Sequence, residues 1–143
     1  MRSPSLTLVV DAAILVAAAR GRSSAAVKKA AVTRFLITTE RAIQEARRRI
    51  ELGMKRPDLL TMVDTLTDSI TVVPATDLES NQAESEHALK EAVASRNGST
   101  RDAHILALAW AVDADIWSSD RDFAGTGVAT WSTPNLMRGL AAG

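Results

Sequence analysis

The sequence predicts one α/β domain, a three-layer α/β/α sandwich with a central parallel sheet of four to five strands. Short apolar runs of strand length alternate with segments of helical length, and this alternation is typical of a parallel sheet with helices on both faces. No linker or internal repeat interrupts the 143 residues, and 46% of them are apolar, which is enough for a normal core. We therefore expect residues 1–143 to form a single domain.

Four segments have the short, apolar and partly β-branched composition of buried strands. They are residues 6–10, 70–73, 116–118 and 128–131. The predicted helices are residues 12–20, 24–31, 39–52, 57–66, 77–95, 102–112 and 134–140. Gly21 and Gly53 are predicted to end two of these helices, and Pro74 to end a strand, because glycine and proline interrupt regular structure.

The composition argues against several classes of protein. There are no cysteines, so we expect no disulfide framework, thiolate zinc site or cysteine nucleophile, which fits a cytoplasmic protein. The longest apolar stretch near the N-terminus, residues 6–19, contains Asp11 and is shorter than the roughly 20 residues that a membrane span needs. There is also no glycine-rich phosphate loop or dinucleotide-binding motif.

The charge is zero overall but unevenly distributed. Zero net charge argues against a protein that binds nucleic acid through the charge of the whole molecule. Residues 40–56, however, carry six basic and three acidic side chains, a net charge of +3. Such a segment is commonly a solvated helix face. The alternative is a basic rim for a polyanionic substrate, with Arg47, Arg48 or Arg49 in contact with phosphates.

Four acidic residues lie where an α/β chain could gather them into one site. Asp11 and Asp120 each follow a predicted strand, and ligands bind at the carboxyl ends of parallel strands. Asp102 begins an apolar helix, and Glu45 lies on an earlier one. Clustered carboxylates repel one another unless a hard cation lies between them, so the set indicates Mg²⁺ or Mn²⁺ and phosphate chemistry. Each aspartate also has an ordinary structural alternative as a helix cap or turn residue.

Helical geometry bears on two of these acids. Asp102 shares its helix face with the residues three, four and seven positions further on, which are all apolar, and a carboxylate there is costly unless it is paired. Glu45 competes with Glu40 for one role. The two lie on opposite sides of the apolar stripe of their helix, each roughly 100° from its middle, so geometry does not choose between them. Asp122 is a fifth acid that could join the site or cap a helical turn.

The other polar residues indicate no competing chemistry. His87 and His104 lack the spacing of a metal-binding pair. His104 is two residues past Asp102, so on a helix it points well away from it, and we expect a buried or solvated bystander. No serine lies in a nucleophile-elbow motif, and the three tryptophans are expected in the core.

Four segments of the chain resemble the PIN-domain family of metal-dependent ribonucleases, and in particular its VapC-like toxins. Residues 102–109 are similar to the family's D-A-x-I-x-A-x-A helix. Residues 116–123 are similar to its strand ending in T-x-D-x-D-F, with Ser118 in place of the threonine. The other two segments are residues 8–12, which look like the opening strand and first acid, and residues 39–46, which look like the helix that carries a later acid.

The resemblance implies a PIN-like fold and a ribonuclease that hydrolyses RNA phosphodiester bonds. Its catalytic and metal-binding residues would be Asp11, Glu45, Asp102 and Asp120, which favours Glu45 over Glu40, and its cofactor Mg²⁺ or Mn²⁺. A VapC-like toxin would have a small antitoxin as partner, and we also expect a homodimer. Ser118 would position the attacking water or a ligand carboxylate.

Two alternatives remain open at this point. One is a PIN-like binding or scaffold module whose acidic site is vestigial. The other is a metal-dependent phosphatase or DNA nuclease, because the sequence shows no residue that would read the 2′-hydroxyl of RNA.

Overall fold

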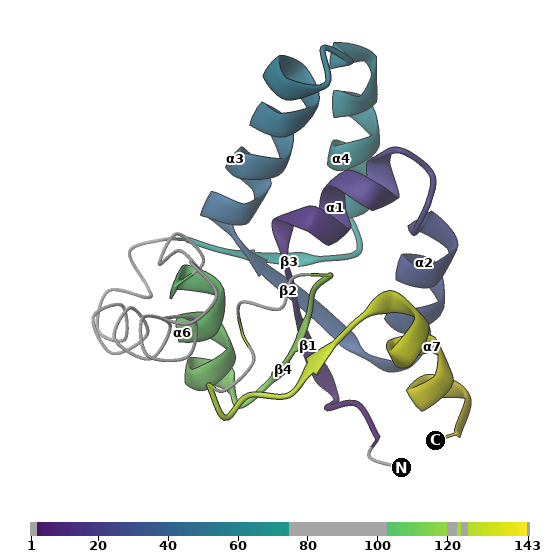
Figure 1. Ribbon diagram of the computed structural model, residues 1–143, viewed down its shortest axis with the longest axis vertical. Coiled ribbons are helices and arrows are strands. Elements are labelled where there is room, and N and C mark those ends of the chain that lie inside the picture. The colour runs from purple at the N-terminus through teal and green to yellow at the C-terminus, as the bar shows by residue number, and fades with distance from the viewer. Residues whose placement is uncertain (1–2, 75–102, 120–122, 124–125, 143) are drawn as a thin grey trace.

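The computed structural model describes residues 3–74, 103–119, 123 and 126–142, and these form a five-stranded parallel sheet with flanking helices (Figure 1). The strand order is β3-β2-β1-β4-β5, which places β1 at the centre. The strands are β1 (Thr7–Val10), β2 (Phe35–Thr39), β3 (Thr71–Val73), β4 (Asp115–Trp117) and β5 (Thr130–Trp131). The predicted α/β sandwich with a parallel sheet is confirmed, and the sheet has the larger of the two predicted strand numbers.

The helices of the described residues follow the predicted ones closely. They are α1 (Ala12–Ala19), α2 (Ser24–Thr33), α3 (Glu40–Arg48), α4 (Leu60–Thr67), α6 (Ala103–Val112) and α7 (Thr133–Ala142). A short 3₁₀ turn, Pro57–Leu59, leads into α4. The predicted helix at residues 77–95 lies outside the described residues.

Helix α3 differs from its prediction in its last turn. The sequence predicts a continuous helix over residues 39–52, whereas the α-helix ends at Arg48 and continues as a wider π-helical turn, Arg49–Gly53. The chain then reverses through Lys55, whose φ is 54°. Few L-residues other than asparagine and aspartate adopt such a φ readily. Backbone hydrogen bonds close the turn: the Met54 N–H donates to the Arg49 carbonyl over 2.8 Å, and the Arg56 N–H to the Ile50 carbonyl over 2.9 Å.

Strand β2 is an element that the sequence analysis missed. It lies directly between α2 and α3, without the glycine or proline that usually marks a strand boundary. Tertiary pairing defines it: the Phe35 N–H donates to the Leu6 carbonyl over 2.8 Å, and Leu36 pairs with Leu8 of β1. The strand matters for function because α3, which carries Glu45, begins where β2 ends.

The helices cover the sheet from both sides. Figure 1 shows α6 on one side of the strands and α2 with α7 on the other. Helix α6 packs across β1, β2 and β4, and its residues from Ala103 to Ala109 are all buried. Helix α1 packs against α2, α3 and α4. Strand β1 is therefore enclosed, as expected for a central parallel strand, and its carboxyl end is firmly positioned.

A membrane span is not found in this part of the chain. Among the described residues no helix combines the length and the apolar character that crossing a bilayer requires. The longest described α-helices have 10 residues, about half of the length that a span needs.

Candidate metal and phosphate site

The candidate site lies where the strand order of the sheet reverses. Strand β1 pairs with β2 on one side and with β4 on the other, and ligands of parallel α/β sheets bind outside the carboxyl ends at such a point. Val10 of β1 pairs with Trp117 of β4, and the Asp11 N–H donates to the Trp117 carbonyl over 3.0 Å. The next residues of the two strands, Asp11 and Ser118, are therefore neighbours at this edge.

Asp11 is buried and its carboxylate is held in a defined orientation. Asp11 is only 4% exposed to solvent. Its Oδ1 accepts from the Ala12 N–H over 2.7 Å, which makes Asp11 the N-cap of α1, and its Oδ2 accepts from the Ser118 hydroxyl over 2.7 Å. Asp11 therefore does serve as a helix cap, which was the structural alternative considered for it. This role does not exclude metal binding, since each carboxylate oxygen has a second lone pair.

Ser118 acts on Asp11 directly. The residue is 2% exposed, and its hydroxyl donates to the carboxylate, as described above. Its own backbone N–H donates to the Trp131 carbonyl of β5 over 3.0 Å, which fixes the residue in the sheet. The Ser118 hydroxyl thus orients the Asp11 carboxylate, and its role toward a metal ligand or an attacking water stays a prediction.

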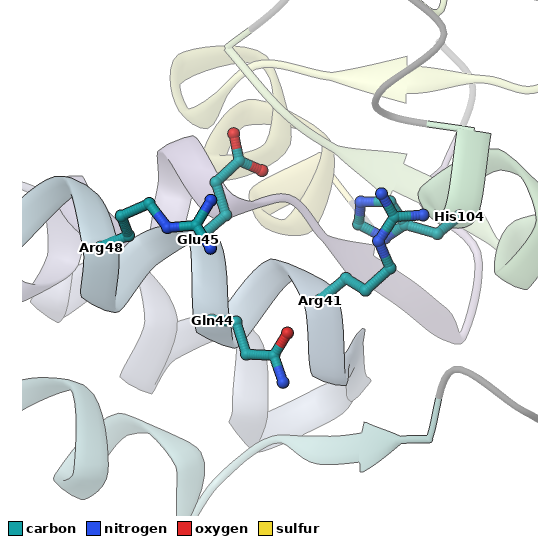
Figure 2. Close-up of a pocket in the computed structure, with 5 residues that line it drawn as sticks. All are labelled: Arg41, Gln44, Glu45, Arg48 and His104. Atoms are coloured by element: carbon teal, nitrogen blue, oxygen red, sulfur yellow. The ribbon is translucent and has the colours of Figure 1, made fainter.

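Glu45 lies just past the middle of α3, in a hollow beside α6. The hollow has a volume of about 220 Å³ and is lined by Arg41, Gln44, Glu45, Arg48 and His104 (Figure 2). The Glu45 side chain is 32% exposed and pairs with Arg49 one turn further on, over 2.8 Å. Such an i,i+4 pair near the surface contributes only about 0.3–0.5 kcal/mol, so an incoming cation could displace it. Glu40, in contrast, is exposed at the start of the helix.

His104 is a buried member of this hollow that sequence reasoning treated as a bystander. It is 3% exposed, and its Nδ1 lies 2.6 Å from the Thr39 hydroxyl, which also accepts from the Ala42 N–H as the N-cap of α3. Burial, and secondarily the nearby charge of Arg41, lowers the pKa of His104 to about 4. The ring is therefore neutral at pH 7. The sequence did carry a signal, because His104 is the single polar residue in the run 103–109.

Only part of the predicted acidic cluster can be placed. Asp102, Asp120 and Asp122 lie outside the described residues, whereas Asp11 and Glu45 lie within them. Within the described ranges no group of three or more metal-binding side chains occurs, which is expected when two of the four predicted ligands are not among them. The chemistry of the donors that are placed fits the predicted ion, because Mg²⁺ and Mn²⁺ prefer carboxylate oxygens.

A second buried aspartate, Asp115, has a structural role. It is 4% exposed at the start of β4, and its Oδ2 accepts from the Ser5 N–H over 3.0 Å and from the Trp131 indole N–H over 2.9 Å. Since it lies at the amino end of β4, it faces the opposite edge of the sheet from Asp11. Burial of an acid is therefore not by itself a sign of function in this protein.

These features define a class of protein: a parallel α/β domain with a carboxylate site at the point where its strand order reverses. The chain matches the PIN domain family over residues 9–141 and belongs to that family. PIN domains are typically nucleases and generally use divalent metal ions.

A solved structure agrees with this assignment at the level of the fold. The chain is similar to PAE2754 from Pyrobaculum aerophilum, with 20% sequence identity and a TM-score of 0.64. The similarity covers 96% of this chain and 91% of that one. No curated protein matches the chain significantly.

Proposed function

We propose that the protein is a Mg²⁺- or Mn²⁺-dependent endoribonuclease that hydrolyses RNA phosphodiester bonds. The observation that carries the proposal is the buried Asp11 carboxylate, held by Ser118 at the reversal of strand order, with Glu45 in an arginine-lined hollow on α3. Carboxylates suit a hard cation, and guanidinium groups suit phosphate oxygens. An acidic centre with a basic rim therefore fits a phosphodiester substrate better than a neutral one.

In this proposal some residues bind the metal ion and others orient its ligands. Asp11 and Glu45 would hold the ion, together with Asp102 and Asp120 as the family resemblance implies. An ion held there would supply an activated water for in-line attack on phosphorus and positive charge to stabilise the leaving 3′-oxygen. Ser118 and the Ala12 N–H orient the Asp11 carboxylate. Cleavage of one RNA and of the DNA with the same sequence, each with metal and with EDTA, tests the substrate assignment.

Metal binding should be measurable without any substrate. We expect Mg²⁺ or Mn²⁺ to raise the melting temperature relative to EDTA, because a ligand that binds only the folded state stabilises it. The gain is about 2.7 kcal/mol when the ion is present at a hundredfold excess over its Kd. Differential scanning fluorimetry and isothermal calorimetry check this.

The control for metal binding is Asp11→Asn. This variant keeps the oxygen that caps α1 but loses the charge, so it should lose most of the metal-induced shift. A wild-type protein that neither melts higher nor releases heat with either ion would favour a scaffold whose acidic site is vestigial.

We further propose that this ribonuclease is a toxin with a small antitoxin as partner and that it forms a homodimer. The proposal is supported by the VapC-like pattern of residues 102–109 and 116–123 in a single small domain. We expect a small protein encoded beside this chain to co-purify with it, and the purified complex to be inactive on RNA until the partner is removed. Size-exclusion chromatography with light scattering measures both assemblies. A chain that stays monomeric, has no partner and is harmless on overexpression would contradict the toxin role.

A further inference from the structure

One face of α3 carries a row of groups suited to a phosphodiester chain. Four side chains of α3 share one face of the helix, because each lies three or four residues from at least two of the others. They line the hollow beside His104 (Figure 2), and they are Arg41, Gln44, Glu45 and Arg48. Glu45 lies between the two arginines along the helix axis. At 1.5 Å per residue, Arg41 is about 6 Å to one side of it and Arg48 about 4.5 Å to the other.

The arginines of α3 and the turn after it differ in what they contact. Arg47 pairs with Asp64 of α4 over 2.5 Å, and Arg49 pairs with Glu45. Arg41 and Arg48 make no ion pair with any other described residue, and both are exposed. The sequence pointed to Arg47, Arg48 and Arg49 without distinguishing them. Within the described part of the chain, Arg41 and Arg48 are the two of these four arginines without an ionic partner, and we take them as the candidates for binding a ligand.

The helix that carries this row is anchored at its amino end. The Thr39 hydroxyl caps α3 through the Ala42 N–H over 3.0 Å and contacts His104 Nδ1 of α6 over 2.6 Å. Arg41 and His104 line the same hollow, and the charge of Arg41 acts on the His104 ring (Figure 2). Positively charged groups on a fixed helix lose less entropy on binding than groups on a mobile loop, so the row is suited to recognising a repeating charge.

We infer that an RNA strand runs along α3, with the phosphate to be cleaved at Glu45 and its two neighbouring phosphates bound by Arg41 and Arg48. The inference rests on the proposed ribonuclease function and adds to it the path of the strand along α3 and two residues that bind it. The arginines contact phosphates and no bases, so they contribute affinity without sequence preference.

The test is RNA binding in EDTA, where cleavage is absent. Fluorescence anisotropy of a fluorescein-labelled single-stranded polyuridine oligomer gives the affinity over a salt series. We expect Arg41→Gln and Arg48→Gln each to weaken binding about tenfold, which is the scale of one charge-assisted hydrogen bond. Each should also lower the slope of log K against log salt by about 0.7, the value for one phosphate of a single strand.

Arg47→Gln is the matched control, because it removes the same charge from the same helix at a residue that pairs with Asp64. It should bind within about twofold of wild type, because the ion pair turns the Arg47 guanidinium group toward Asp64 of α4 and not toward the strand. Equal losses for Arg41→Gln and Arg47→Gln would show a non-specific charge effect and overturn the inference. Undetectable binding by wild type would also overturn it. A polyglutamate competitor as effective as polyuridine would overturn it as well, because the row would then bind an acidic protein.

Cleavage in Mg²⁺ separates this inference from the proposed function. If both hold, Arg41→Gln raises KM and leaves kcat nearly unchanged, because a neighbouring phosphate is bound equally in the ground and transition states. Wild-type binding that depends on Arg41 and Arg48 without any cleavage would support the strand path and contradict the ribonuclease. Normal cleavage and normal binding by both variants would contradict the strand path and support the ribonuclease.

Discussion

Asp11→Asn is expected to reduce RNA cleavage by at least ~10²-fold, which is the scale of losing one preorganised electrostatic stabiliser. Asn can keep the contacts of this side chain with Ala12 and Ser118, since its oxygen can accept from the Ala12 N–H and the Ser118 hydroxyl can rotate to accept from its amide. The substitution thus removes the charge and preserves the cap of α1. Cleavage of a labelled RNA under single-turnover conditions measures the effect.

The same result is expected for the other aspartates that the family resemblance assigns to the metal. Asp102→Asn and Asp120→Asn should each lose a similar factor, and double variants should lose little more than single ones, because ligands of one ion act as a unit. All three variants should remain folded. They should melt at least as high as wild type without metal, since each relieves repulsion among the predicted carboxylates. Full activity of Asp11→Asn, with contaminating nucleases excluded, would rule out the proposed mechanism.

Glu45→Gln and Glu40→Gln are expected to differ by about 10²-fold in cleavage rate, on the same scale as the loss of one electrostatic stabiliser. Glu45 lines the hollow beside His104, whereas Glu40 is exposed in the first turn of α3. Loss of Glu45 should therefore resemble Asp11→Asn, and loss of Glu40 should leave activity near that of wild type. The measurement is the same single-turnover assay, with melting temperature recorded for both variants.

This pair of variants has a built-in control for helix stability. Glu40 interacts favourably with the amino end of α3, so Glu40→Gln should cost a few tenths of a kcal/mol of stability without affecting catalysis. Glu45→Gln also releases Arg49, and the Arg49→Gln variant measures that contribution separately. Wild-type activity in Glu45→Gln together with inactive Glu40→Gln would mean that the family's helix motif is placed in the wrong register on this chain.

Several structural predictions could be made from local sequence because their causes are local. The strand at β1 and the helix after it follow from an apolar run ended by an aspartate, and Asp11 caps α1 as such a residue often does. The start of α3 at Thr39 is likewise a local capping signal. Strand β2 was missed because its extended conformation depends on pairing with β1, and nothing in the neighbouring sequence marks its ends.

The candidate site shows the same division between local and long-range causes. The sequence by itself determined which residue types are present: carboxylates after apolar strands, an acid on the helix after residue 39, and a segment with excess arginine. The tertiary structure decided which of them meet. Ser118 reaches Asp11 only because β1 and β4 are neighbours, and His104 reaches Thr39 only because α6 packs over β2. Among the described residues it also distinguished Arg47 and Arg49, which have ionic partners, from Arg41 and Arg48, which have none. The partner of Arg47, Asp64, lies on another helix, so the local sequence does not predict that pair.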